Sequence, residues 1–263
     1  MKWIQKGTLQ YEAAEGIGVP HAFTTRLGGV SEGDLSSLNL SVSRGDTPEN
    51  VEKNLKVLGH ALGFSPRDLV MTHQTHTTIV RTVGEEDKGT GFYKPGFPDC
   101  DGLVTRTPGV ALMIFTADCT PLLFWDPVTG AVGAAPAGWR GTAGDIGGKT
   151  VEAMVREFGC RREDIRGAVG PNIGPCCFET DRDVPDAMAA QLGPEAESAV
   201  RKAGEKYYVN LTEINARLLR RAGLQHVEVS TFCTSCRTDL FWSHRKMGKA
   251  RGSQGAVILC REK

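Results

Sequence analysis

The chain has 263 residues, of which 40% are hydrophobic and 24% are charged, as in an ordinary globular protein. Lysine plus arginine and aspartate plus glutamate number 31 each, so the net charge is zero and excludes bulk attraction to nucleic acid or to an anionic membrane. No linker or repeat divides the sequence, and we expect one domain over 1–263 and a monomer. The first residues lack a signal peptide's apolar stretch and no run could span a membrane, which favours a cytoplasmic location.

Helices are predicted where apolar residues recur at helical spacing between residues typical of helix ends. The first helix is the clearest, because Thr47 can cap its start, Pro48 suits its first position and Gly63 its end. The predicted helices are 47–63, the segment around 151–158, 183–191 and 210–223. The predicted strands are 78–83, 111–115, 121–125, 131–135, 165–169, 227–231 and 256–260. The order has no regular βαβαβ rhythm and indicates an α/β protein, a mixed sheet packed by helices.

A β-hairpin is predicted where turn residues separate the apolar runs 121–125 and 131–135. If Trp125 pairs with Gly130 across that turn, the same register places Cys119 opposite Pro136. Cys119 follows an acidic residue, Asp118, and lies beside a Gly-Trp-Arg-Gly segment. It is therefore a candidate reactive thiol or metal ligand, the alternative being a small buried apolar residue.

Other candidate site residues lie further along the chain. His73 and His76 precede a predicted strand, and residues three apart on an extended segment point to opposite faces, so we do not expect them to bind one ion. Arg26 and Arg140 lie in glycine-containing segments that suit phosphate or carboxylate, although structural ion pairs in tight turns are the alternative. Asn39 offers an amide for a ribose or a base.

The eight cysteines do not indicate a disulfide-rich scaffold. Cys233 and Cys236 have the spacing of a redox pair or of half a zinc site, but no second pair with this spacing exists. Cys176 and Cys177 are adjacent and cannot easily form a disulfide with each other. We therefore expect Cys233 and Cys236 to be structural, the alternative being a redox or metal role.

The sequence resembles the YfiH/YlmD family, whose members are described as multicopper polyphenol oxidases, laccase-domain proteins and purine nucleoside phosphorylases. The matching segments are His21–Ser31, Ser37–Leu40, Gly45–Asp46, Gln74–His76, Asp101–Thr105, Thr116–Cys119, Ala137–Thr142, Gly170–Glu179 and Phe241–Arg245. The resemblance implies the family's α/β fold, likened to bacterial cysteine deamidase toxins. It also implies zinc held by His76, Cys119 and a third ligand at position 136. Because Pro136 offers no donor there, we expect weak zinc binding and reduced turnover.

The resemblance implies phosphorolysis of purine nucleosides such as adenosine, inosine, guanosine and methylthioadenosine, together with deamination of adenosine. In that role Arg26, Asn39 and Arg140 would bind nucleoside and phosphate, while Asp118 assists the leaving purine beside His76 and Cys119. A copper oxidase is less favoured, since six histidines without a His-x-His pair are too few for a multi-copper centre. The remaining alternatives are a metal-free Cys-His hydrolase or deamidase and a binding protein with a degenerate site.

Overall fold

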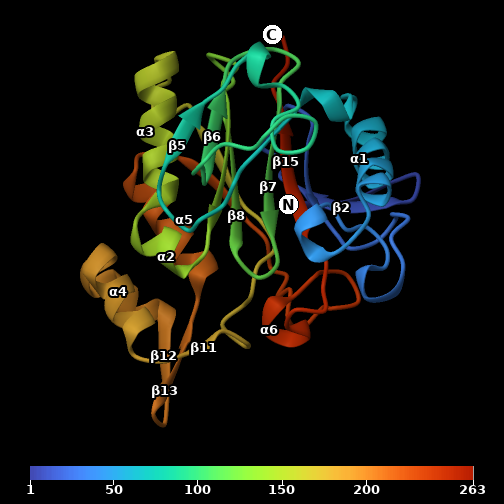
Figure 1. The fold of residues 1–263 in the computed structure, drawn as a ribbon. Helices are drawn as coiled ribbons and strands as arrows, with labels where there is room; N and C mark the ends of the chain where they lie inside the picture. Colours follow the sequence, from blue (N-terminus) through green and yellow to red (C-terminus); the bar gives the residue numbers. More distant parts are fainter. Residues whose placement is uncertain (263) are drawn as a thin grey trace.

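The computed structural model describes residues 1–262 and contains two six-stranded sheets that pack face to face. Helix α1 (Pro48–Leu62) covers the outer face of the first sheet, whereas α3 (Ile146–Phe158) and α5 (Leu211–Arg221) cover the outer face of the second (Figure 1). The layers are therefore helix, sheet, sheet, helix. The α/β class predicted from the sequence is confirmed, with the strands divided between two sheets.

The first sheet consists, in spatial order, of β1 (Lys2–Lys6), β2 (Leu9–Ala13), β3 (His21–Thr24), β15 (Gln254–Leu259), β7 (Ala111–Thr116) and β4 (Leu69–Met71). The second consists of β14 (His226–Val229), β10 (Arg166–Val169), β8 (Thr120–Trp125), β9 (Val132–Ala137), β6 (Gly102–Thr105) and β5 (Val80–Thr82). Neighbouring strands are antiparallel except at three edge pairs, β4 with β7, β10 with β14 and β5 with β6. Both sheets are therefore mixed.

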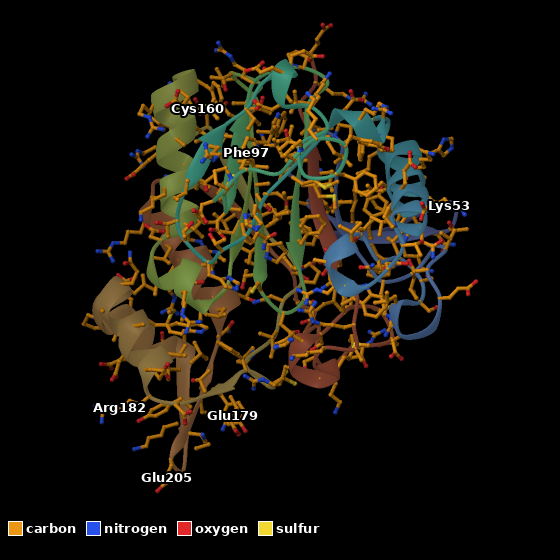
Figure 2. All side chains as sticks on the ribbon, in the orientation of Figure 1. Lys53, Phe97, Cys160, Glu179, Arg182 and Glu205 are labelled. Atoms are coloured by element: carbon orange, nitrogen blue, oxygen red, sulfur yellow. The ribbon has the colours of Figure 1, made fainter. Side chains whose placement is uncertain are left out.

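A smaller unit projects from one end of the molecule. It contains the three-stranded sheet of β11 (Glu179–Thr180), β13 (Lys206–Val209) and β12 (Val200–Ala203), beside α4 (Asp183–Leu192) (Figure 1). Figure 2 shows the exposed side chains of Glu179, Arg182 and Glu205 around this projection. Two short helices, α2 (Trp139–Ala143) and α6 (His244–Met247), complete the fold. No helix within residues 1–262 is long and apolar enough to cross a membrane.

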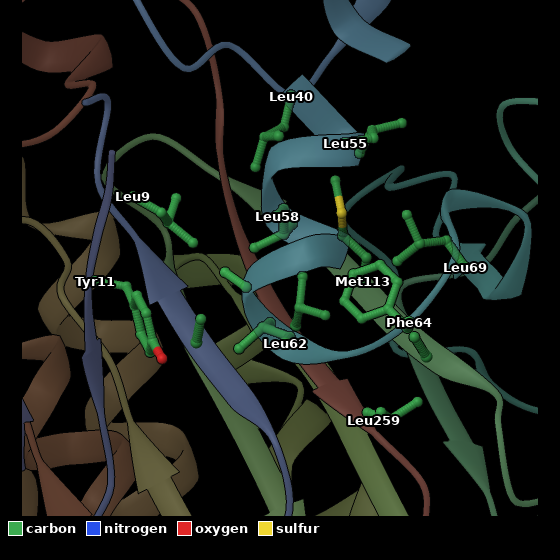
Figure 3. Packing of buried hydrophobic residues seen from close by; sticks show 14 of the residues in the cluster. Leu9, Tyr11, Leu40, Leu55, Leu58, Leu62, Phe64, Leu69, Met113 and Leu259 are labelled. Carbon is green, nitrogen blue, oxygen red and sulfur yellow. The ribbon is translucent and has the colours of Figure 1, made fainter. Parts of the chain in front are cut away.

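Helix α1 forms as its end residues predict. The Thr47 side chain accepts a hydrogen bond from the Asn50 N–H at 3.2 Å, and Gly63 ends the helix in the left-handed region at φ 80°. Its apolar side then packs on the first sheet, where Leu55 and Leu58 meet side chains such as Met113 (Figure 3). Tertiary packing of this apolar stripe contributes more to such a helix than intrinsic propensity does.

The apolar layer between the two sheets joins them into one structure. Phe23 and Leu112 enter it from the first sheet, and Leu123 and Ala134 enter it from the second. All four side chains are essentially inaccessible to water. Burial of a side chain such as Leu123 stabilises the fold by roughly 1.5–3 kcal/mol.

The predicted hairpin forms as β8 and β9, but the expected register was wrong by two residues. Pro121 pairs with Pro136, and continuing this register places Cys119 opposite Gly138 rather than opposite Pro136. The cause is a wider turn than expected. The Asp126 carboxylate accepts the N–H groups of Val128 at 2.7 Å and of Thr129 at 3.3 Å, which holds the turn open.

Pro136 lies inside a central strand, a position that normally excludes proline. The Asp126 N–H bonds to the Ala131 carbonyl at 2.9 Å, so by strand alternation Pro121 and Pro136 form a non-hydrogen-bonded pair. The nitrogen of Pro136 consequently faces the β6 side, at a level where β6 has not yet begun. The proline therefore interrupts little of the sheet's hydrogen bonding.

Candidate functional site

A cavity of about 610 Å³ opens at one end of the sheet sandwich. Its walls come from the segment before α1, the residues after β4, the connection between β7 and β8, and the residues around α6 and before β15. The polar side chains that line it are Ser41, Ser43, Arg44, Thr72, His73, Gln74, Thr116, Cys119, Arg251, Ser253, His76 and His244. No aspartate or glutamate is among its lining residues, so the cavity carries positive charge and can accept an anion.

Two of the predicted site residues, His76 and Cys119, meet in this cavity. The Cβ that Gly138 lacks would lie 2.9 Å from the Cys119 sulfur and 4.0 Å from Nδ1 of His76. The thiol and the imidazole therefore face the same point, next to the start of α2. Any side chain at position 138 would fill the space between them.

The backbone at His76, and at the residue before Cys119, is held in an unusual conformation. His76 has φ 62° and Asp118, the residue before Cys119, has φ 88°, values that non-glycine residues adopt at a cost. The buried Asp101 carboxylate accepts the N–H of His76 at 3.1 Å and the N–H of Thr77 at 2.8 Å, which fixes the turn that presents the imidazole.

Asp118 faces away from the cavity. Its carboxylate accepts hydrogen bonds from the Thr234 hydroxyl at 2.7 Å, the Ser243 hydroxyl at 3.1 Å and the Arg245 N–H at 2.6 Å. Both oxygens are thus engaged by the segment that leads into α6. Asp118 positions this segment and Cys119, and its side chain is not available to a molecule in the cavity.

The donor set does not fit a three-ligand catalytic zinc ion. Burial, reinforced by the negative charge of Asp118, raises the pKa of the Cys119 thiol to about 11. Pro136 has no donor atom, and within residues 1–262 no third histidine, cysteine or carboxylate joins His76 and Cys119 at ligand spacing. Residues 1–262 also contain no histidine cluster for a multi-copper centre.

Arg251 and Arg44 supply the positive charge of the cavity. The Arg251 side chain is 7% exposed, and its Nε has no hydrogen-bond partner. Burial, with the nearby positive charge of Arg44, lowers the pKa of Arg251 to about 10. In the described part of the chain neither arginine forms a salt bridge. A buried guanidinium without a counter-ion is the expected partner of an anionic ligand.

Sequence reasoning missed these two arginines, although Gly45 follows Arg44 and Gly252 follows Arg251 as directly as glycine follows Arg140. The arginines that it selected lie elsewhere. Arg26 donates to the carbonyls of Ser36 and Thr238 and lies 3.9 Å above the Trp242 ring, whereas Arg140 is exposed on α2. Neither lines the cavity.

Asn39 lies behind the cavity wall and is fully buried. Its amide donates to the Ser41 carbonyl at 2.9 Å and to the Asp46 carboxylate at 3.0 Å, while its oxygen accepts the Ser253 N–H at 3.0 Å. Ser41 and Ser253 both line the cavity. Asn39 thus joins two walls of the cavity.

The apolar part of the cavity is formed by Leu40, Met71, Phe92 and Phe115. A flat ring can pack there while its charged or polar groups face Arg251 and the histidines. Fold and cavity together define a class, that of an α/β protein whose cavity, at the ends of its strands, is suited to a small anionic molecule beside an aromatic one.

Comparison with known proteins identifies the family. A family model described as multi-copper polyphenol oxidoreductase laccase matches residues 20–261. The chain is 44% identical to a purine nucleoside phosphorylase of Deinococcus radiodurans, over 93% of this chain and 90% of that protein. It is 37% identical to purine nucleoside phosphorylase YlmD of Geobacillus stearothermophilus, over 96% and 93%. The crystal structure of YlmD from the same organism superposes with a TM-score of 0.93 at 36% identity, covering 99% of each chain. The chain belongs to the YfiH/YlmD family, as its motifs predicted.

Proposed function

We propose that the protein cleaves purine nucleosides with inorganic phosphate in the cavity described above. The observation that carries the proposal is Arg251, a buried cation with an unpartnered Nε in a cavity without carboxylates. Phosphate satisfies such a guanidinium better than a neutral ligand does. The names of the relatives, which are purine nucleoside phosphorylases, support the same substrate pair.

In this reaction the bond between C1′ of the ribose and N9 of the purine breaks, and a phosphate oxygen bonds to C1′. Arg251 and Arg44 hold the phosphate and compensate its charge as it attacks. The purine packs against Phe92 and Phe115 and leaves with a proton from the imidazole of His76 or His244, both of which line the cavity. The products are ribose 1-phosphate and the free base.

The proposal extends to adenosine, inosine, guanosine and methylthioadenosine as substrates. We expect deamination of adenosine to be the weaker activity, because activation of water by zinc needs three protein ligands and position 136 offers none. The raised pKa of Cys119 argues against a metal-free cysteine hydrolase. A thiol with a pKa of about 11 is almost fully protonated at neutral pH and is a poor nucleophile.

The test is release of hypoxanthine from inosine with and without phosphate, with ribose 1-phosphate measured as the second product. The proposal expects release only with phosphate, with ribose 1-phosphate formed in equal amount. Equal rates in both conditions would show hydrolysis instead. Binding of nucleoside without any cleavage would identify the degenerate binding protein.

A further inference from the structure

A second cluster of reactive side chains lies outside the cavity. Strands β10 and β14 are parallel neighbours, and their last residues, Val169 and Val229, pair with each other. The segments that follow the two strands therefore start side by side at the same end of the sheet. The first of these segments carries Cys176 and Cys177, and the second carries Cys233 and Cys236. Sheet pairing thus brings together cysteines that are separated by more than fifty residues of sequence.

The four sulfur atoms lie within 4.8 Å of one another. The Cys236 sulfur is 3.5 Å from that of Cys176 and 3.4 Å from that of Cys177. Four sulfurs bound tetrahedrally at about 2.3 Å from one zinc ion are about 3.8 Å apart, whereas a disulfide needs about 2.05 Å. The observed spacing is close to that of a shared metal ion and well above that of a disulfide.

The surroundings of the cluster suit thiolates. The N–H of Gly174 donates to the Cys233 sulfur at 3.1 Å, and a Cβ on Gly174 would lie only 3.1 Å from the Cβ of Cys233. The Arg245 guanidinium donates to the Cys177 carbonyl at 2.9 Å, which places a positive charge beside the cluster. Hydrogen bonds to sulfur and a nearby cation both stabilise the negative charge of a tetrathiolate.

We propose that Cys176, Cys177, Cys233 and Cys236 bind one structural Zn²⁺ ion. Four sulfur ligands complete a tetrahedral shell, so no position is left for water or substrate. Each thiol loses its proton to solvent as its sulfur bonds to the metal, and no oxidation state changes. The site is separate from the cavity and does not depend on the reaction that takes place there.

The metal would hold the segments that form one cavity wall. Thr234 lies between two of the ligands, and its hydroxyl donates to the Asp118 carboxylate at 2.7 Å. The same carboxylate accepts the Arg245 N–H at 2.6 Å, and His244 beside it lines the cavity. Zinc in the cluster therefore fixes the position from which His244 reaches the cavity.

The first experiment measures zinc per chain in protein purified under reducing conditions. The parent is compared with a Cys233→Ser/Cys236→Ser variant, which loses two ligands, and with Cys119→Ser, a matched change in the cavity. We expect one zinc per chain in the parent and in Cys119→Ser, and none in the double variant. Loss of zinc in Cys119→Ser with retention in the double variant would overturn the proposal.

A second measurement uses the parent alone, in case the double variant does not fold. Cys176 and Cys236 are exposed, so as free thiols they react readily with iodoacetamide. We expect both to be protected in the isolated protein and to become modified after treatment with a zinc chelator. Equal modification before and after chelation, or the finding of disulfides among the four cysteines, would refute the zinc site.

Discussion

A buried arginine with no carboxylate partner lowers the stability of a folded protein unless a ligand compensates its charge. Arg251 is in this situation, since its side chain is 7% exposed and its Nε is unpartnered. The effect of Arg251 on the stability of the fold and its effect on ligand binding should therefore be measurable separately by mutation.

Arg251→Gln should raise KM for phosphate roughly 10- to 100-fold, because charge-assisted hydrogen bonds to the anion are lost. The melting temperature should stay constant or rise, since the variant no longer buries an uncompensated charge. Steady-state kinetics and thermal unfolding give the two values. Arg140→Gln, an exposed change outside the cavity, is the control and should leave both unchanged. A large drop in melting temperature for Arg251→Gln would instead indicate a structural arginine.

Pro136→His should create the missing third zinc ligand. Position 136 pairs with Pro121, which lies two residues after Cys119 on the same face of the hairpin. Such diagonal neighbours are about 7–8 Å apart, a distance that an imidazole can bridge. We expect zinc per chain to rise by one relative to the parent. Adding Cys119→Ser should abolish this gain, because it removes a ligand of the same ion. An unchanged zinc content in Pro136→His would contradict the assignment of this position.

A local motif identified only some of the residues that line the cavity. Arg26 and Arg140 lie in such motifs but outside the cavity, and residues that the fold alone brings there were not predicted. Cys119 and His76 belong to distinctive motifs, and the structure places both in one cavity. Arg251 belongs to no such motif. It lies near Arg44 because the segment that leads into β15 forms a wall of the cavity. The cysteine pairs were judged separately in the sequence, because their proximity depends on the parallel pairing of β10 with β14.

The elements show the same distinction. Helix α1 was predicted within a residue at each end, because Thr47 and Gly63 act locally. The hairpin of β8 and β9 was predicted, but its register was not. That register depends on hydrogen bonds from Val128 and Thr129 to the Asp126 side chain, an effect that apolar patterning does not encode. Several short strands carry too little apolar pattern and were missed. They are β1, β2, β3, β4 and β6 of the two large sheets and β11, β12 and β13 of the small sheet.

The segment between Asn39 and α1 depends on the charge of Asp46. Burial alone would raise the pKa of Asp46, but hydrogen bonds from Asn39 and Ser31, with others, lower it below the ordinary 3.8. A depressed pKa in the folded state adds stability above the unfolded value, and this stability is lost as the pH falls through the folded value. The ionised Asp46 therefore stabilises this segment at neutral pH and stops doing so in acid.

Asp46→Asn should lower the free energy of unfolding by about 1 kcal/mol at pH 7, a value reduced by the partial exposure of the site. The difference from the parent should shrink at acidic pH, as the pH falls through the lowered pKa of Asp46 in the folded state. Urea unfolding at both pH values measures it. Asp34→Asn, at an exposed position, should change the free energy by less than about 0.5 kcal/mol at either pH. A difference for Asp46→Asn that is independent of pH would show that charge is not the cause.

The two sheets share one apolar layer, so we expect them to unfold together. Leu123 is fully buried in that layer, and Leu123→Ala should lower the free energy of unfolding by about 2–5 kcal/mol. Tryptophan fluorescence and far-ultraviolet circular dichroism should then shift by the same amount. Val30→Ala, at a side chain 42% exposed, should change it by less than about 0.5 kcal/mol. Separate transitions for the two probes would contradict the single domain predicted from the sequence.

The position of β15 determines when the molecule can assemble during synthesis. This strand lies between β3 and β7 in the middle of the first sheet, yet the ribosome makes it after all of its neighbours. Until residues 254–259 emerge, β3 and β7 expose unpaired edges, and the nascent chain is open to association with other chains. Arg251 and Ser253 immediately precede β15, so the cavity closes in the same late step. Ribosome stalling before residue 254 should therefore yield chains that need a chaperone and bind no phosphate.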